Sequence, residues 1–167
     1  FGRFVNDTTL KRIVGQEESS INFDEIVNKG KILLVKLGKG RFGSEVSALL
    51  ANMLVTRFKF AAMKRGELPK ESRRDFYLYV DEAHNLPQGD SLSDLLAEAR
   101  KYRLGLVLAT QYCSQLGNLA GGRGDDLLAA IFGNVGSIIT FRTGTQDAEH
   151  LARGFVPHFS QTDIIAL

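Results

Sequence analysis

Two polar groups in the sequence follow apolar runs and have the residue types of a hydrolytic site. Asp81 and Glu82 come directly after FYLYV, and Thr110 and Gln111 end the run LGLVLATQ. In nucleoside-triphosphate hydrolases, an Asp after an apolar run holds Mg²⁺, and an adjacent Glu can take a proton from the attacking water. An amide both donates and accepts hydrogen bonds, so Gln111 can orient that water or contact the terminal phosphate. The spacing favours a nucleotide site, with Asp81 on the metal, Glu82 as the base, and Thr110 and Gln111 at the nucleotide.

The acid pair also has an ordinary structural interpretation, because Asp and Glu at a strand end often only cap a turn. The position of Gln111 after the next apolar run favours the catalytic interpretation. In open α/β sheets the carboxyl ends of the strands lie together, and ligands bind beside them.

The elements that position these residues alternate between short apolar runs and helical patterns. Strands are predicted over 31–37, 76–80, 104–110 and 137–142, and helices over 44–65, 91–103, 125–133 and 145–154. The unbroken apolar character of FYLYV is typical of a parallel strand covered on both faces. The alternation predicts an α/β fold, in which a mostly parallel sheet is flanked by helices on both faces.

The glycine loop KLGKGRFGS is a candidate phosphate cradle, because Gly38, Gly40 and Gly43 match G-x-G-x-x-G between a predicted strand and helix. A dinucleotide site requires an acidic residue about 20 positions further on, and the next acid at a strand end is the more distant Asp81. The loop is not a Walker A motif either, because Ser44 stands where that motif has Lys. We interpret it as a strand-to-helix turn.

Composition limits the class of protein. The 167 residues have a net charge of +2 and the length of one domain. The single Cys113 excludes an internal disulfide and suits a reducing compartment. The histidines His84, His150 and His158 lack metal-ligand spacing, and the apolar runs are shorter than a membrane span requires.

Several other residues have two interpretations each. A basic cluster around one loop is suited to nucleic-acid phosphates but also to solvent, and the second interpretation is favoured because no aromatic residues are interleaved with it. His84 is interpreted as a turn residue, and Cys113 as a small apolar residue beside the sheet. The basic cluster consists of Lys64, Arg65, Lys70, Arg73 and Arg74.

Three segments, YLYVDEAHNL, LLAEARKYRLGLVLATQYCSQL and AIFGNVGSIITFRTGTQDAEHLAR, carry a family resemblance. They resemble the later part of the HerA and FtsK-like motor ATPases, nearest to the TraG and TraD group of conjugation coupling and secretion ATPases. KGKILLVKLGKGRFGSEVSALLANMLV resembles the strand and helix that precede the Walker B strand there. The resemblance implies a RecA-like P-loop core, a homo-hexameric ring, and ATP with Mg²⁺. It also implies DNA or protein translocation with secretion-channel proteins at the cytoplasmic face of the bacterial inner membrane.

One departure from that family is the absence of G-x-x-x-x-G-K-[ST] from the sequence. We therefore expect residues 1–167 to be one partial domain that lacks the Walker A strand. Residues 1–30 would be a lead-in segment, and residues 31–167 the Walker B and sensor half of an ATPase core. Such a fragment should not hydrolyse ATP alone, because the phosphate-binding amides and Lys are missing. A longer polypeptide or another copy is expected to complete it.

Ring ATPases of this kind take an arginine from the adjacent subunit, and Arg142 and Arg100 are the candidates. Each is also consistent with a surface charge.

Two rival functions stay open. VDEAH matches the box of DEAH-type helicases, although LATQ replaces their Ser-Ala-Thr motif, and a non-hydrolysing ring-assembly module would use the same sheet for subunit contacts.

Overall fold

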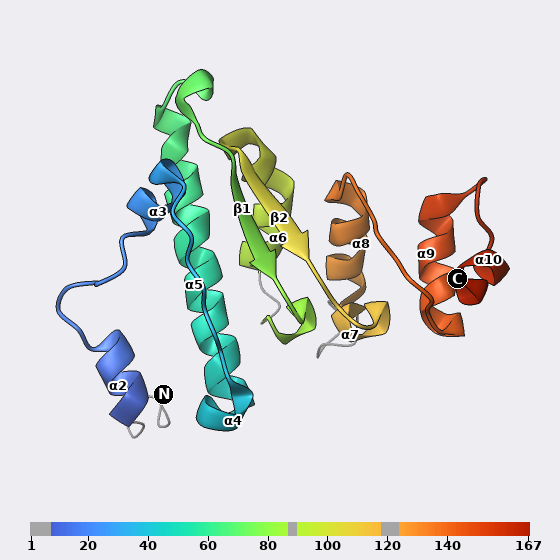
Figure 1. Cartoon of the computed structure of the whole chain (residues 1–167), viewed down its shortest axis with the longest axis horizontal. Coiled ribbons are helices and arrows are strands. Elements are labelled where there is room, and N and C mark those ends of the chain that lie inside the picture. Colours follow the sequence, from blue (N-terminus) through green and yellow to red (C-terminus); the bar gives the residue numbers. More distant parts are fainter. Residues whose placement is uncertain (1–7, 87–89, 118–123) are drawn as a thin grey trace.

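A computed structural model of the chain describes residues 8–86, 90–117 and 124–167 (Figure 1). Its sheet has two parallel strands, β1 (Phe76–Val80) and β2 (Leu104–Leu108). Phe76 lies opposite Leu104 and Val80 opposite Leu108. Aromatic, branched and leucine side chains suit this half-buried pleated surface. Both strands were predicted, and both are confirmed.

Helices cover one face of the sheet and connect its strands. The long α5 (Ser44–Lys64) precedes β1, and the crossover to β2 contains α6 (Asp90–Glu98) and the 3₁₀ helix η4 (Ala99–Tyr102). The other helices are α2 (Thr8–Val14), α3 (Phe23–Lys29), α4 (Lys39–Phe42), α7 (Cys113–Gly117), α8 (Gly124–Asn134), α9 (Thr145–Phe155) and α10 (Gln161–Ala166). Shorter 3₁₀ turns are η1 (Arg65–Glu67), η2 (Lys70–Ser72) and η3 (Ala83–Asn85).

One helix start and one helix end can be compared with local features of the sequence. Ser160 and Asp163 form a capping box at the start of α10, in which each side chain bonds the other residue's backbone N–H. Gly154 was expected to close the preceding helix, but α9 continues to Phe155. Gly154 has none of the left-handed geometry that a terminating glycine adopts.

Two predicted strands are absent from the described residues. Segments 31–37 and 137–142 have no regular secondary structure, and each appears in Figure 1 as a trace between helices. Their apolar residues alternate, with Ile32, Leu34, Ile139 and Phe141 at least four-fifths exposed. A strand forms only when a neighbour supplies its backbone partners, and no neighbouring strand is described for either segment.

Among the residues that the structure describes, helices cover one face of the sheet, whereas helices were expected on both faces. Phe76, Leu78 and Val80 pack against the cluster built by α5, α6 and η4. The side chains on the other face of β1 are exposed, Tyr77 to 57% and Tyr79 to 72%. The Tyr77 ring lies against Gly105, where an added Cβ would stand 2.6 Å from Tyr77 Cδ1, so a larger residue at position 105 would require the ring to move.

The main core lies between α5, α6 and the sheet. It contains Val55 and Ala62 of α5, Leu92 and Leu95 of α6, and Leu104 of β2. Burying one such leucine stabilises the fold by about 1.5–3 kcal/mol. This core therefore fixes the crossover that brings β2 beside β1.

One helical stretch, Ser44–Glu67, has the length and apolar composition of a membrane span, contrary to the sequence expectation. Core helices of soluble proteins also have these properties. Val55 and Phe58 of this stretch are buried in the clusters that contact α3, α6 and the sheet. Part of this stretch therefore packs in the core, with 39% of its apolar window buried.

Candidate functional site

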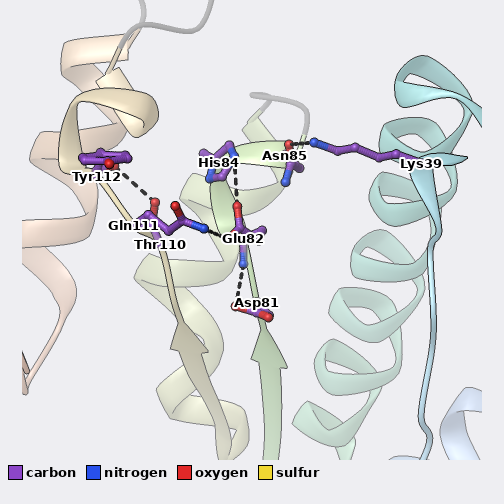
Figure 2. A network of polar contacts seen from close by, with 8 residues as sticks. All are labelled: Lys39, Asp81, Glu82, His84, Asn85, Thr110, Gln111 and Tyr112. Atoms are coloured by element: carbon purple, nitrogen blue, oxygen red, sulfur yellow. Dashed lines mark hydrogen bonds and ion pairs between the residues drawn. The ribbon is translucent and has the colours of Figure 1, made fainter.

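The candidate site lies at the carboxyl ends of β1 and β2, which end side by side. Backbone hydrogen bonds continue past both strands, from Ala109 N–H to Val80 O at 2.9 Å and from Ala83 N–H to Ala109 O at 2.8 Å. This continuation holds the two following segments close together. It places the predicted acid pair beside the predicted amide (Figure 2).

Glu82 and Gln111 are in direct contact. The Gln111 Nε2 donates to Glu82 Oε1 at 2.7 Å, although the two residues come from different strand ends. The expected proximity of the acid and the amide is therefore present. Their chemical roles stay predictions.

The Glu82 carboxylate has a second neighbour that the sequence interpretation missed. His84 Nε2 lies 3.2 Å from Glu82 Oε2, and its side chain is only 16% exposed. His84 was interpreted as a turn residue, and it does lie in the turn η3. Its ring nevertheless points back to Glu82 (Figure 2). The sequence did carry a signal for this contact, because Glu82 and His84 are only two positions apart across a tight turn.

Asp81 and Thr110 flank this contact. Asp81 Oδ1 accepts from the Glu82 backbone N–H at 3.0 Å, and the Asp81 side chain is exposed. Thr110 Oγ1 donates to Tyr112 O at 3.2 Å. No cluster of three or more metal-ligating side chains occurs among the described residues. An exposed carboxylate fits a Mg²⁺ ion that keeps several waters and phosphate oxygens, because such an ion requires only one or two protein carboxylates.

The glycine loop reaches the same edge of the sheet. Lys39 Nζ donates to Asn85 Oδ1 at 2.6 Å, which ties the loop to the turn after β1. Gly43 has a φ of 77°, a positive value that suits glycine at the junction with α5. The turn interpretation is consistent with this geometry, but sequence reasoning did not find the Lys39 contact.

Neither candidate arginine lies in this contact network. Arg100 belongs to η4, which ends just before β2 begins, whereas the site is at the other end of that strand. Arg142 is exposed in the segment before α9. No hydrogen bond or ion pair joins either guanidinium to another side chain in the described ranges. A role in a neighbouring subunit stays a prediction for both.

Most side chains of the basic cluster make hydrogen bonds or ion pairs with other parts of the chain. Arg65 is 1% exposed, and Arg73 donates to the carbonyls of Gly66, Leu68 and Lys101. Lys64 pairs with Asp24 at 2.6 Å, and Arg74 donates to the Lys29 carbonyl. The solvent interpretation that the sequence favoured is therefore wrong for Arg65, which is buried against backbone carbonyls.

Cys113 packs beside the sheet as predicted. It contacts the apolar cluster that contains Val80 and Leu108, and its backbone N–H donates to Asp147 Oδ2 at 2.9 Å. Burial, followed by the nearby Asp147 charge, raises the pKa of the Cys113 thiol to about 11. Cys113 is therefore a protonated, unreactive thiol near neutral pH.

An open cavity of about 800 Å³ lies between α8 and α9, apart from this edge. Phe132, Ile138, His150 and Arg153 are among its lining residues. Asp81, Glu82 and Gln111 do not line it.

The fold and the polar edge define a small parallel α/β unit with an acid pair and an amide at neighbouring strand ends. The family model described as the type IV secretion-system coupling protein DNA-binding domain matches residues 24–156. The chain belongs to this family. No curated protein and no solved structure gives a significant match to it.

Proposed function

We propose that the chain is the Walker B and sensor half of an ATP-hydrolysing motor of conjugative transfer or type IV secretion. Asp81 would hold Mg²⁺ through water, Glu82 would accept the proton of the attacking water, and Thr110 and Gln111 would contact the nucleotide. Mg²⁺ would neutralise charge on the phosphates. Membership of the coupling-protein family supports the proposal.

The observation that carries the proposal is the contact between Gln111 Nε2 and Glu82 Oε1 at 2.7 Å. It joins the ends of two parallel strands at the edge where ligands of α/β sheets bind. A base and a water-orienting amide must both contact the same water molecule, so their side chains must lie close together. The contact between Glu82 and Gln111 agrees with this requirement.

The phosphate-binding part of the site would come from residues outside these 167. The sequence contains no Walker A motif, and the glycine loop is tied to Asn85. We infer that the chain alone does not hydrolyse ATP, and that the natural polypeptide or another copy completes the sheet. The uncovered sheet face and the two unpaired apolar segments support this inference.

Further properties follow from the family and are proposed with it. The partner is DNA, in agreement with the family description, together with secretion-channel proteins at the cytoplasmic face of the inner membrane. The working form is a homo-hexamer, in which Arg142 or Arg100 acts on a neighbour's nucleotide. Such an arginine raises the rate by about 10³ to 10⁵ where it is present.

The test compares Glu82→Gln with wild type in the natural polypeptide that contains this chain. We expect ATP binding to be retained, because the amide is isosteric, and turnover to fall by roughly 10² to 10⁴, the value of a positioned base. Unchanged turnover would remove Glu82 from the mechanism. Absence of both nucleotide binding and turnover in the wild type would favour the assembly module.

A further inference from the structure

The contact between His84 and Glu82 has no part in the function proposed above. The Glu82 carboxylate has a neighbour at each oxygen: Gln111 Nε2 donates to Oε1 at 2.7 Å, and His84 Nε2 lies 3.2 Å from Oε2 (Figure 2). We propose that His84 is a positioning residue that fixes the carboxylate of Glu82 at the end of β1, in the orientation in which it receives the proton of the attacking water. This inference rests on the proposed function.

The backbone of the turn directs His84 toward Glu82. Glu82 adopts a left-handed conformation with φ 52° and ψ 48°, which is uncommon for a residue other than glycine. The chain then turns through η3, where Asn85 N–H donates to Glu82 O at 2.8 Å. The residue two positions after Glu82 is thereby folded back beside the Glu82 side chain.

The turn does not depend on the imidazole ring. Its backbone bonds run from Ala83 N–H to Ala109 O at 2.8 Å and from Leu86 N–H to Ala83 O at 3.1 Å. Ala83 and Leu86 are also buried. A turn held in this way would accept many residues at position 84. The direction of the ring toward Glu82 is therefore a feature that the turn alone does not require.

The Nε2 side of the His84 ring is the side that meets a polar group. His84 Nε2 lies 3.2 Å from Glu82 Oε2. His84 Nδ1, on the other side of the ring, is buried and has no hydrogen-bond partner. The ring is therefore oriented by its contact with Glu82.

These two contacts leave the carboxylate competent as a base. A carboxylate has about four lone-pair sites, and Gln111 and His84 approach one oxygen each. The remaining sites can accept from water. The two contacts thus restrict the rotation of Glu82 without consuming its capacity to accept a proton, and a misplacement of about 1 Å in such a group costs roughly 100-fold in rate.

The experiment measures steady-state ATP hydrolysis by the natural polypeptide with substitutions at position 84. His84→Leu removes the donor and keeps an apolar side chain, whereas His84→Gln keeps an N–H donor. We expect His84→Leu to lower kcat by about 10- to 100-fold, the cost of a misplaced catalytic group, and to change KM for ATP by less than about 2-fold. His84→Gln should recover part of the lost kcat. His158→Leu, the same change at an exposed site, should behave as wild type.

Combination with Glu82→Gln separates positioning from general destabilisation. If His84 acts through Glu82, His84→Leu adds no further loss in the Glu82→Gln background, because coupled residues are not additive. A wild-type kcat for His84→Leu, or the same loss in both backgrounds, would overturn the inference while leaving the proposed function intact. If His84→Leu does not fold, His84→Ala takes its place. A wild-type kcat for His84→Ala, or a kcat for His84→Gln as low as that of His84→Ala, would then overturn the inference. Unchanged turnover of Glu82→Gln alone would overturn the proposed function and this inference together.

Discussion

Replacement of Arg65 by Ala should destabilise the chain more than any exposed substitution. The Arg65 guanidinium is 1% exposed, and its Nη1 donates to Tyr102 O at 2.9 Å and to Arg103 O at 3.4 Å. Its Nη2 donates to Arg74 O. Arg65 thereby joins the end of α5 to the segments that enter both strands. Burial, followed by the charge of Arg73, lowers the pKa of Arg65 below the usual value of an arginine.

The expected loss follows from the carbonyl groups that would lose a donor. Arg103 O also accepts from Phe76 N–H at 3.1 Å, so it keeps one partner. Tyr102 O and Arg74 O would lose the Arg65 donor, at about 1–3 kcal/mol each. We expect Arg65→Ala to lower the free energy of unfolding by about 3–4 kcal/mol, with some relief from water that enters the space.

The assay is urea unfolding followed by far-UV circular dichroism. Arg57→Ala is the matched control, because Arg57 is an exposed arginine on the same helix. It should change the free energy of unfolding by less than about 0.5 kcal/mol. Equal unfolding midpoints for the two variants would refute the reasoning, since the buried carbonyl contacts would then contribute nothing measurable.

Three further predictions concern single side chains. Gln111→Ala should slow ATP hydrolysis in the natural polypeptide without lowering the melting temperature, and a large fall in melting temperature would show that Gln111 is structural. Cys113, with a pKa raised by burial to about 11, should react with iodoacetamide at pH 8 about 100-fold more slowly than an unperturbed thiol, and a reaction rate that levels off near pH 9 would contradict this. The hydrogen bond from Lys29, with a second from Lys31, lowers the pKa of Glu25 from 4.5 to about 2. The folded-state pKa is depressed, so the Glu25 contribution to stability is present above pH 4.5 and is lost as the pH falls toward 2. Acid titrations of stability should show a smaller loss in that window for Glu25→Gln than for wild type, and identical curves would contradict the prediction.

The sequence was sufficient for the elements whose signals are local. FYLYV, LGLVL and the helical pattern after Gly43 each carry their own periodicity, and all three form the expected elements. The juxtaposition of Glu82 and Gln111 was also predictable, because parallel strands present their carboxyl ends on one edge.

The elements that failed depend on partners far away in the sequence. Segments 31–37 and 137–142 have strand-like composition, but a strand also requires a neighbouring backbone, and the described residues supply none. The contacts of His84 and Lys39 depend on how tightly the turn after β1 folds back. The burial of Arg65 depends on how the end of α5 packs against η4, and no local pattern in the sequence predicts this packing.

The most direct test of the central claim is a crystal structure of the natural polypeptide with Mg²⁺ and a non-hydrolysable ATP analogue. The account predicts the metal beside Asp81, with Glu82 and Gln111 facing the terminal phosphate. A nucleotide bound away from this edge, for example in the cavity between α8 and α9, would contradict it.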